Sequence, residues 1–175
     1  MGNNLYRMFS FFLILFIAVS CNKPNDEKLT RPLVYKNGLL FSDSLSAAPF
    51  SGRHKSRMRD MKIEYEVVNG VKQGDFTIYF SNDKIQMTGK MFNNKNIGEW
   101  KYYFSSGALQ TTGTFENDIP SGKWTWFQTD GRISEEGNFF NGIRDGNWLS
   151  YDSLGKVEVI RVYKNGEIID STKIG

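Results

Sequence analysis

The sequence has little of the chemistry on which most active sites depend. Its 175 residues include one cysteine and one histidine, and its formal net charge is only +3. A single cysteine excludes an internal disulfide, and a single histidine excludes a histidine-rich metal site. Near-balanced charge gives no sign of a nucleic-acid partner. The adjacent Glu135 and Glu136 would face opposite sides of a strand, so they cannot work as a carboxylate pair. We therefore expect no catalytic residues, no metal and no cofactor.

Proline is also scarce, whereas glycine and aromatic residues are abundant. The chain has four prolines, 17 glycines and 15% aromatic residues, a composition that favours β structure. The abundant residues recur with a period of 24 residues between residues 74 and 166. A regular repeat of this length indicates a repeat architecture, and such architectures usually serve binding. The repeated positions are an opening glycine (Gly74, Gly98, Gly122, Gly146), an aromatic residue two places later (Phe76, Trp100, Trp124, Trp148), a second aromatic five places later (Tyr79, Tyr103, Phe127, Tyr151) and a late asparagine (Asn93, Asn117, Asn141, Asn165).

Each clean unit is predicted to form a β-hairpin. In the unit that opens at Gly98, a two-residue type I′ turn at Ser106-Gly107 sets Trp100 opposite Gly113. The turn position needs a positive φ, which suits Gly107, Gly131 and Gly155 and is tolerated by Asp83. This register places one set of residues on an apolar face: Trp100, Tyr102, Phe104, Leu109, Thr111, Gly113 and Phe115.

Strand glycines are predicted to make room for the rings of this face. Gly89, Gly113 and Gly137 would lie opposite Phe76, Trp100 and Trp124, so that each ring lies flat over a backbone without a Cβ. Arg161 takes this place opposite Trp148, which suggests that the last unit is a cap with a wetter face. Asn-Gly pairs at residues 69–70, 141–142 and 165–166 would form the turns between hairpins, giving a meander.

The first 20 residues are predicted to be a signal peptide. Arg7 is followed by an apolar run from Phe9 to Val19, which is shorter than the ~20 residues of a membrane-spanning helix. Ala18-Val19-Ser20-Cys21 resembles a bacterial lipoprotein signal, which implies lipidation of Cys21. An ordinary cleaved signal or an uncleaved anchor is the alternative. Residues 21–32 would then be the lipidated cysteine and a flexible tether. The expected location is the cell envelope, lipid-anchored to the outer membrane and either periplasmic or surface-exposed.

Residues 33–73 form a degenerate part of the repeat domain, which spans residues 33–175. Tyr35-Lys36-Asn37-Gly38 repeats the letters of residues 163–166, and the distance from Gly52 to Gly74 is 22 residues instead of 24. A basic run between Arg53 and Lys62 contains the only histidine, His54. This run is interpreted as the solvated face of an irregular hairpin, with a patch facing anionic lipid headgroups as the alternative.

The pattern G-x-W-x-x-Y-x-x-x-G-x-L-x-x-x-G-x-F-x-N resembles the MORN repeat variant of many bacterial proteins, which are often labelled antitoxin-like. It covers residues 74–166 well and residues 33–69 loosely. The resemblance implies an all-β fold, a single-layered, twisted antiparallel meander of consecutive β-hairpins. It also implies a non-catalytic binding or scaffold module whose partner is a protein, a glycan or lipid headgroups. An antitoxin-like or immunity protein that neutralises a toxin is the alternative.

Two surfaces are candidates for binding. The apolar face lacks any helix to cover it, so we expect the sheet to curl over most of it and to leave an aromatic groove. The candidate groove residues are Trp100, Tyr102, Phe104, Trp124 and Trp126. The alternative is a row of stacking platforms on the polar face, made of Tyr79, Tyr103, Phe127 and Tyr151, although cross-strand packing accounts for this row more simply.

Overall fold

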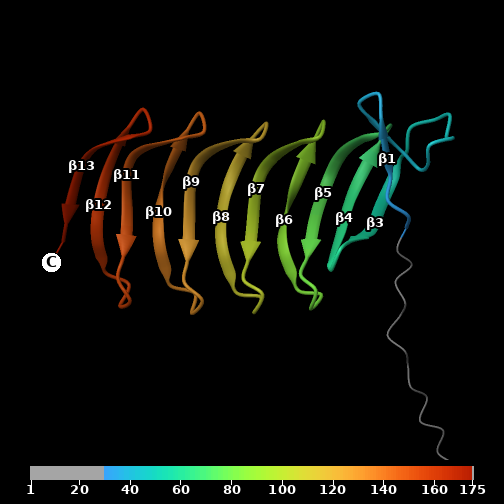
Figure 1. Ribbon diagram of the computed structural model, residues 1–175. Coiled ribbons are helices and arrows are strands. Elements are labelled where there is room, and N and C mark those ends of the chain that lie inside the picture. Colours follow the sequence, from blue (N-terminus) through green and yellow to red (C-terminus); the bar gives the residue numbers. More distant parts are fainter. Residues whose placement is uncertain (1–29, 175) are drawn as a thin grey trace, which may run out of the picture.

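The computed structural model describes residues 30–174, which form thirteen β-strands without a helix in this part of the chain (Figure 1). The predicted signal peptide (1–20), Cys21 and most of the predicted tether lie outside the described residues. The strands are β1 (Val34–Lys36), β2 (Leu39–Phe41), β3 (Gly52–Met58), β4 (Met61–Val68), β5 (Val71–Tyr79), β6 (Ile85–Phe92), β7 (Lys95–Tyr103), β8 (Leu109–Glu116), β9 (Ile119–Phe127), β10 (Ile133–Phe140), β11 (Ile143–Tyr151), β12 (Val157–Lys164) and β13 (Glu167–Lys173).

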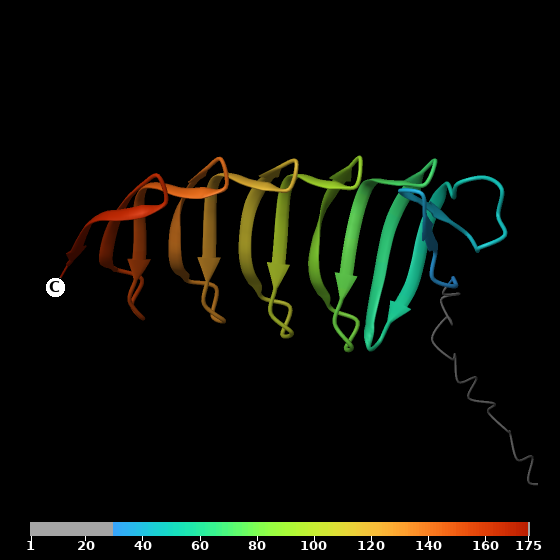
Figure 2. The ribbon, with the colours of Figure 1, turned by 45° about the horizontal axis from the view of Figure 1, so that its top comes forward.

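Eleven of these strands form one open antiparallel sheet. The strands lie in the order of the chain, from β3 at one edge to β13 at the other, and each pairs with its sequence neighbours. The second view shows a single layer of bowed strands, with a row of turns along each rim (Figure 2). The prediction of an all-β meander of consecutive hairpins is therefore confirmed.

The register within the hairpins agrees with the prediction except next to the loops. Trp100 pairs with Gly113 and Tyr102 with Thr111, but Leu109 then pairs with Tyr103, which shifts the register by one residue. The prediction of an unshifted register, which would set Leu109 opposite Phe104, is therefore wrong. The cause is the loop, in which Gly107 N donates to Phe104 O at 2.8 Å and Phe104 N to Ala108 O at 2.9 Å.

The loop type differs from the predicted type I′ turn. Gly107 has φ +94°, as expected, but Ser106 is not among the residues with positive φ. A type I′ turn requires positive φ at both central residues, whereas a three-residue loop that closes with a glycine bulge requires it once. Asp83, Gly131 and Gly155 take the same conformation, with φ of +60°, +88° and +79°. The bulge explains why glycine recurs at this position.

Type I′ turns occur instead between the hairpins. Both central residues have positive φ there, as at Asn69 (+48°) and Gly70 (+79°) or at Asn141 (+50°) and Gly142 (+81°). Asparagine and glycine take this conformation at low cost, so the predicted role of the asparagine-rich pairs is confirmed.

The opening glycine of each repeat creates a second, wider bulge. Between β6 and β7, Thr88 pairs with Lys101 and Lys90 with Ile97, so that one residue of β6 faces three of β7. Gly98 lies in the longer segment with φ +64°, which is a conformation that favours glycine. The bulge shifts the following ring, Trp100, toward the preceding hairpin.

This shift corrects the predicted pairing of rings and glycines. The strand partners are as predicted, with Trp100 opposite Gly113. However, the ring that lies over Gly113 is that of Trp124, because a Cβ added at Gly113 would overlap the Trp124 indole. Gly89 and Gly137 are covered in the same way by the rings of the following repeats (Trp100 and Trp148). Each tryptophan therefore joins two successive hairpins.

The degenerate N-terminal part folds into two short pieces. The β1–β2 hairpin leaves the large sheet and packs beside it, with Leu40 N donating to Gly70 O at 2.9 Å. The β3–β4 hairpin is regular from Gly52 to Val67, since its pairs follow without a shift up to Met58 and Met61. The prediction of an irregular hairpin here is wrong. Its two-residue turn has no bulged loop, which accounts for the two residues lost from the repeat.

Candidate functional site

Groups that could perform chemistry are sparse in the structure. Among residues 30–174 no cluster of three or more His, Cys, Asp or Glu side chains could hold a metal ion. Within the same residues there is no helix with the length and hydropathy needed to span a bilayer. What the sheet does present is a continuous row of aromatic rings.

The aromatic row follows the length of the sheet. Neighbouring ring centroids lie 5.0–6.5 Å apart, which is the spacing of stacked and edge-to-face aromatic pairs. The row consists of Phe50, His54, Tyr65, Phe76, Trp100, Phe115, Trp124, Trp126, Phe139, Trp148 and Tyr163. Because each ring packs on rings of neighbouring strands, the row is both the core of the single-layered sheet and one of its surfaces.

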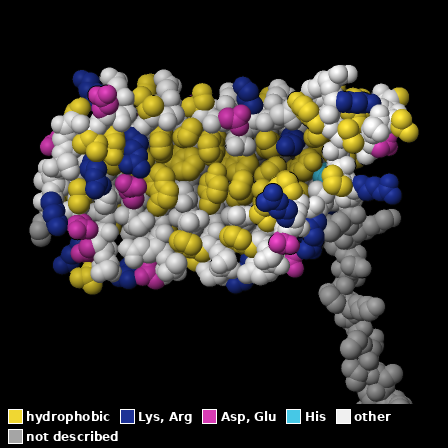
Figure 3. Space-filling view, in the orientation of Figure 1, with side chains coloured by type: hydrophobic (Ala, Val, Ile, Leu, Met, Phe, Trp, Pro, Cys, Tyr) yellow, Lys and Arg dark blue, Asp and Glu magenta, His cyan; other side chains and the backbone are white. Residues whose placement is uncertain are grey.

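The rings of the row differ in burial, so that buried rings form the bottom of the band and half-buried rings line its sides. Trp100, Trp124 and Trp148 are buried, with 1%, 7% and 0% of their surfaces exposed. Half-buried side chains lie above and between them, including Tyr102 and Trp126. The space-filling view shows the result as a hollowed apolar band along the middle of this face (Figure 3). We call this band the aromatic groove and define it by Trp100, Tyr102, Phe115, Trp124, Trp126 and Phe139.

Four of the five predicted groove residues belong to this band. Phe104 is placed differently, at the loop end of β7, where it lines a shallow cavity of about 300 Å3 together with Tyr102 and Met87. Burial raises the pKa of the Tyr102 hydroxyl, which lies at the junction of the groove and this cavity.

Two cations cover the ends of the row. Lys72 Nζ lies 5.2 Å from the ring centroid of Tyr65 and 5.9 Å from that of Phe76. Arg144, three repeats later at the same phase, lies 3.9 Å above the Trp148 ring. Dark blue side chains flank both ends of the apolar band in Figure 3. The aromatic row therefore carries a cation on each side of the groove. Sequence reasoning missed both cations, although their separation of three periods could have revealed them.

The prediction of a wetter last repeat agrees with its edge strand, in which every residue of β13 is exposed, but not with its tryptophan. Arg161 does lie opposite Trp148, and its guanidinium donates to Ser150 Oγ at 2.9 Å. Nevertheless Trp148 is fully buried, because the Arg144 guanidinium covers its ring from the other side.

One indole at the groove floor has an unused donor. Trp124 Nε1 donates to Thr114 O at 3.2 Å, and Trp148 Nε1 donates to Asn138 O at the same distance. Trp100 Nε1 is buried without a hydrogen-bond partner among the described residues. An unpaired buried donor lowers the stability of the fold.

The alternative row on the polar face is occupied by its own neighbours. Lys62 Nζ lies 4.2 Å above the Tyr79 ring, and the Tyr151 hydroxyl donates to Glu136 at 3.0 Å. Burial and the Glu136 carboxylate raise the pKa of Tyr151. Tyr103 and Phe127 are half-buried at the corresponding strand ends. These contacts favour cross-strand packing for the row of Tyr79, Tyr103, Phe127 and Tyr151.

The basic run is largely engaged by one carboxylate. Glu64, of which 4% is exposed, lies 2.8 Å from Arg53, 3.4 Å from Lys62 and 3.8 Å from Lys55. The hydrogen bond from Arg53 to Glu64 raises the pKa of that guanidinium. Three cations around one buried acid form a structural cluster on the polar face, so this part of the basic run is less solvated than the interpretation of a solvated strand face expects.

His54 lies on the opposite face and holds the first described residue. Thr30 Oγ1 donates to Lys55 O at 2.7 Å, so its contact of 2.8 Å with His54 requires Nδ1 of the ring to be the donor. Nε2 is then unprotonated, and it is buried without a partner in the described part of the chain. Burial lowers the pKa of His54, so the ring is neutral and serves to attach the chain to the edge strand β3.

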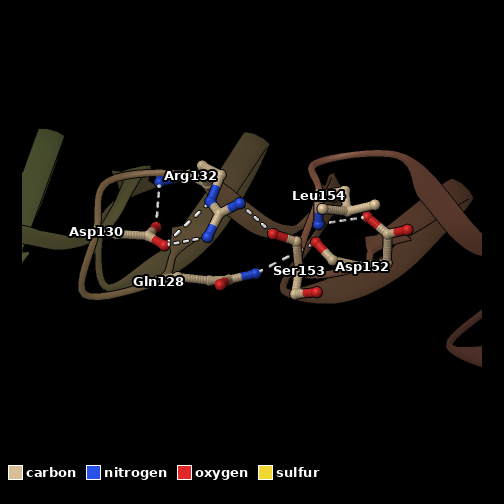
Figure 4. Close-up of polar contacts among 6 residues, drawn as sticks. All are labelled: Gln128, Asp130, Arg132, Asp152, Ser153 and Leu154. Carbon is tan, nitrogen blue, oxygen red and sulfur yellow. Dashed lines mark hydrogen bonds and ion pairs between the residues drawn. The ribbon is translucent and has the colours of Figure 1, made fainter.

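The loop rim opposite the Asn-Gly turns is held together across repeats. Arg132 donates through Nε to Asp130 at 3.0 Å and reaches Ser153 O in the next loop (Figure 4). Gln128 Nε2 also reaches the next loop, at 3.5 Å from Asp152 O. The hydrogen bond from Arg132 lowers the pKa of Asp130. These polar groups of two neighbouring loops are engaged with one another.

Comparison with known proteins identifies the repeat. Residues 97–117 and 144–165 match the family model of the MORN repeat variant. The two segments correspond to the hairpin β7–β8 and to the hairpin β11–β12, which share the phase of the 24-residue period. No curated protein matches the chain. The chain therefore carries MORN-variant β-hairpin repeats.

Proposed function

We propose that the protein is a non-catalytic binding module whose aromatic groove takes a partner in the cell envelope. The observation that carries the proposal is the groove itself, an unbroken row of rings left half-covered by the fold. Soluble monomers rarely expose a contiguous apolar surface of more than a few hundred Å2 without a use for it. The cation Lys72 lies next to the groove, over the rings of Tyr65 and Phe76.

Other features support binding in place of catalysis. The histidine is engaged in holding Thr30, and the buried carboxylate of Glu64 is engaged in ion pairs with Arg53 and Lys62. Repeats of this kind present extended surfaces, which suit a partner that lies along several units. The polar-face row is a weaker candidate because Tyr79 and Tyr151 are held by Lys62 and Glu136.

We propose further that Cys21 is lipidated and anchors the module to the outer membrane. The chain enters the fold at Thr30, nine residues after Cys21, so the segment between them spans at most about 30 Å when fully extended. The tether would then keep the edge strand β3 within reach of the bilayer.

Replacement of Cys21 by serine tests the anchor. Labelled palmitate is expected to enter the native protein, whereas Cys21→Ser is expected to lose both the label and membrane retention. Cys21 is the only cysteine in the chain, so no second thiol can carry the label. Unchanged labelling of the variant would refute lipidation at this residue.

Replacement of Tyr102 by glutamate tests the groove. A charge placed in the half-buried apolar band is expected to abolish partner capture, because a carboxylate there loses hydration without gaining a counter-ion. The circular dichroism spectrum should stay that of a β protein. As matched controls, Tyr103→Ala and Tyr151→Ala alter the polar face. Capture that survives Tyr102→Glu but fails in those two variants would assign binding to the polar face.

A further inference from the structure

A small cavity lies where the β1–β2 hairpin packs beside the large sheet. It has a volume of about 240 Å3 and is lined by Tyr35, Leu40, Lys72 and Asn94. Because Lys72 also overlies the rings of Tyr65 and Phe76, the cavity adjoins the N-terminal end of the aromatic row. We call this cavity the Lys72 pocket.

Lys72 is a half-buried cation whose charge is not balanced within the fold. Residues 30–174 provide it with no ion pair, and burial lowers the pKa of its ammonium group. Arg144 offers an internal comparison, because it occupies the same phase of the repeat and also lies over aromatic rings. Arg144 has partners, with Glu135 at 3.6 Å and the Tyr163 hydroxyl at 2.9 Å. The acidic partner present at Arg144 is missing at Lys72.

The other polar groups of the pocket can donate hydrogen bonds. Asn94 Oδ1 accepts from the backbone N–H of Lys72 at 2.8 Å, so the amide nitrogen of Asn94 is left to donate. Tyr35 contributes a hydroxyl group, and none of the lining residues is acidic. One cation and two neutral donors match a singly charged carboxylate better than a phosphate, which usually recruits several cations or a bidentate arginine.

The apolar part of the pocket indicates what the carboxylate is attached to. Leu40 lines the cavity, and the rings of Tyr65 and Phe76 lie beneath Lys72. The cavity is smaller than the roughly 300–1,000 Å3 that encloses a drug-sized ligand, so it suits the end of a longer ligand. The aromatic groove continues from it along the sheet.

We propose that the Lys72 pocket binds the C-terminal carboxylate of a partner peptide whose last residue is apolar. The peptide chain continues from the pocket along the aromatic groove, and this second part rests on the proposed function of the groove. Lys72 supplies the counter-ion, Asn94 and Tyr35 donate to the carboxylate oxygens, and Leu40 contacts the terminal side chain.

A titration with a fragment of such a peptide tests the pocket alone. N-acetylphenylalanine carries the carboxylate and an apolar side chain, and N-acetylphenylalanine amide is its uncharged match. The free acid is expected to shift the amide NMR signals of Leu40, Lys72 and Asn94 saturably at millimolar concentration and to raise the pKa of Lys72. The amide and inorganic phosphate are expected to bind about tenfold more weakly or worse. Equal shifts with the amide, preference for phosphate or no shift at all would overturn the proposal.

Asn94→Asp is the sharpest variant because the fold already accepts aspartate at this position. One repeat later, Asp118 Oδ1 accepts from Asn96 N at 2.7 Å, just as Asn94 accepts from Lys72. The variant should therefore fold normally while its carboxylate repels the ligand and weakens binding of the free acid about tenfold or more. Asp118→Asn is the matched control and should bind as the native protein does. Native affinity in Asn94→Asp would contradict the proposal.

Failure of the pocket and failure of the groove give different results. Tyr102→Glu is expected to bind N-acetylphenylalanine with native affinity, because Tyr102 does not line the Lys72 pocket. A protein that loses capture of its partner in Tyr102→Glu but shows no fragment binding would retain the function of the groove and reject the carboxylate site.

Discussion

Trp124→Ala is expected to lower the free energy of unfolding by about 3–5 kcal/mol. The indole is 93% buried, and its ring centroid lies 5.1 Å from that of Phe115 and 5.8 Å from that of Phe139. It also covers Gly113 and donates to Thr114 O. Truncation therefore removes contacts with both neighbouring hairpins and leaves a cavity between them. Denaturant unfolding of the native protein and the variant measures the effect.

The same variant distinguishes a central core residue from a surface aromatic. Tyr103→Ala serves as the control, because Tyr103 is half-buried on the polar face and should lose much less stability. Hydrogen exchange should show the largest loss of protection in β8, β9 and β10, since repeat units depend chiefly on their nearest neighbours. An equal loss in both variants, or native stability in Trp124→Ala, would contradict the assignment of the aromatic row as the core.

Gly113→Val is expected to destabilise the protein by about 3 kcal/mol, at the upper end of the usual cost of overpacking. A Cβ at Gly113 would overlap the indole of Trp124, which also packs against the rings of Phe115 and Phe139. Valine is otherwise a good strand residue, and Gly113 is not among the glycines with positive φ, so the cost arises from the ring and not from the backbone. Denaturant unfolding again gives the free energy.

Two comparisons separate the ring overlap from other effects at this position. Thr114→Val introduces the same side chain one residue later on the polar face and should be nearly neutral. In the Trp124→Ala background the ring is absent, so Gly113→Val should cost far less than in the native protein. Additive losses in the double variant would show that the Trp124 ring is not the group that valine displaces.

The repeat predicted the hairpins because its signal lies within one unit. The phase of Trp100 and Gly113 defines their pairing, and the structure confirms it. The wrong predictions concern the bulges and the packing between successive repeats, which the pattern of one repeat does not specify. The glycine bulge at Gly107 moves Leu109 by one place, and the wider bulge at Gly98 carries each ring onto the preceding hairpin. The strand pairing within one hairpin does not show that its ring lies over a glycine of the preceding hairpin.

The candidate site shows the same division. The rings of Trp100, Tyr102, Trp124 and Trp126 were predicted from alternation along their strands. Lys72 could have been found only by noticing that it lies three periods before Arg144. The pocket beside it depends on the β1–β2 hairpin leaving the sheet and packing against Gly70, a departure from the repeat that periodicity cannot predict.

Photo-crosslinking in intact cells tests most directly whether the aromatic face is the binding face. A photoreactive amino acid placed at Tyr102 would report on the groove, and the same amino acid at Tyr103, the next residue of β7, would report on the opposite face. The account predicts one recurrent crosslinked partner from position 102 and none from position 103. A stoichiometric toxic protein crosslinked from position 102 would identify the partner as a toxin while keeping the groove as the site. Crosslinking from position 103 alone would contradict the central claim.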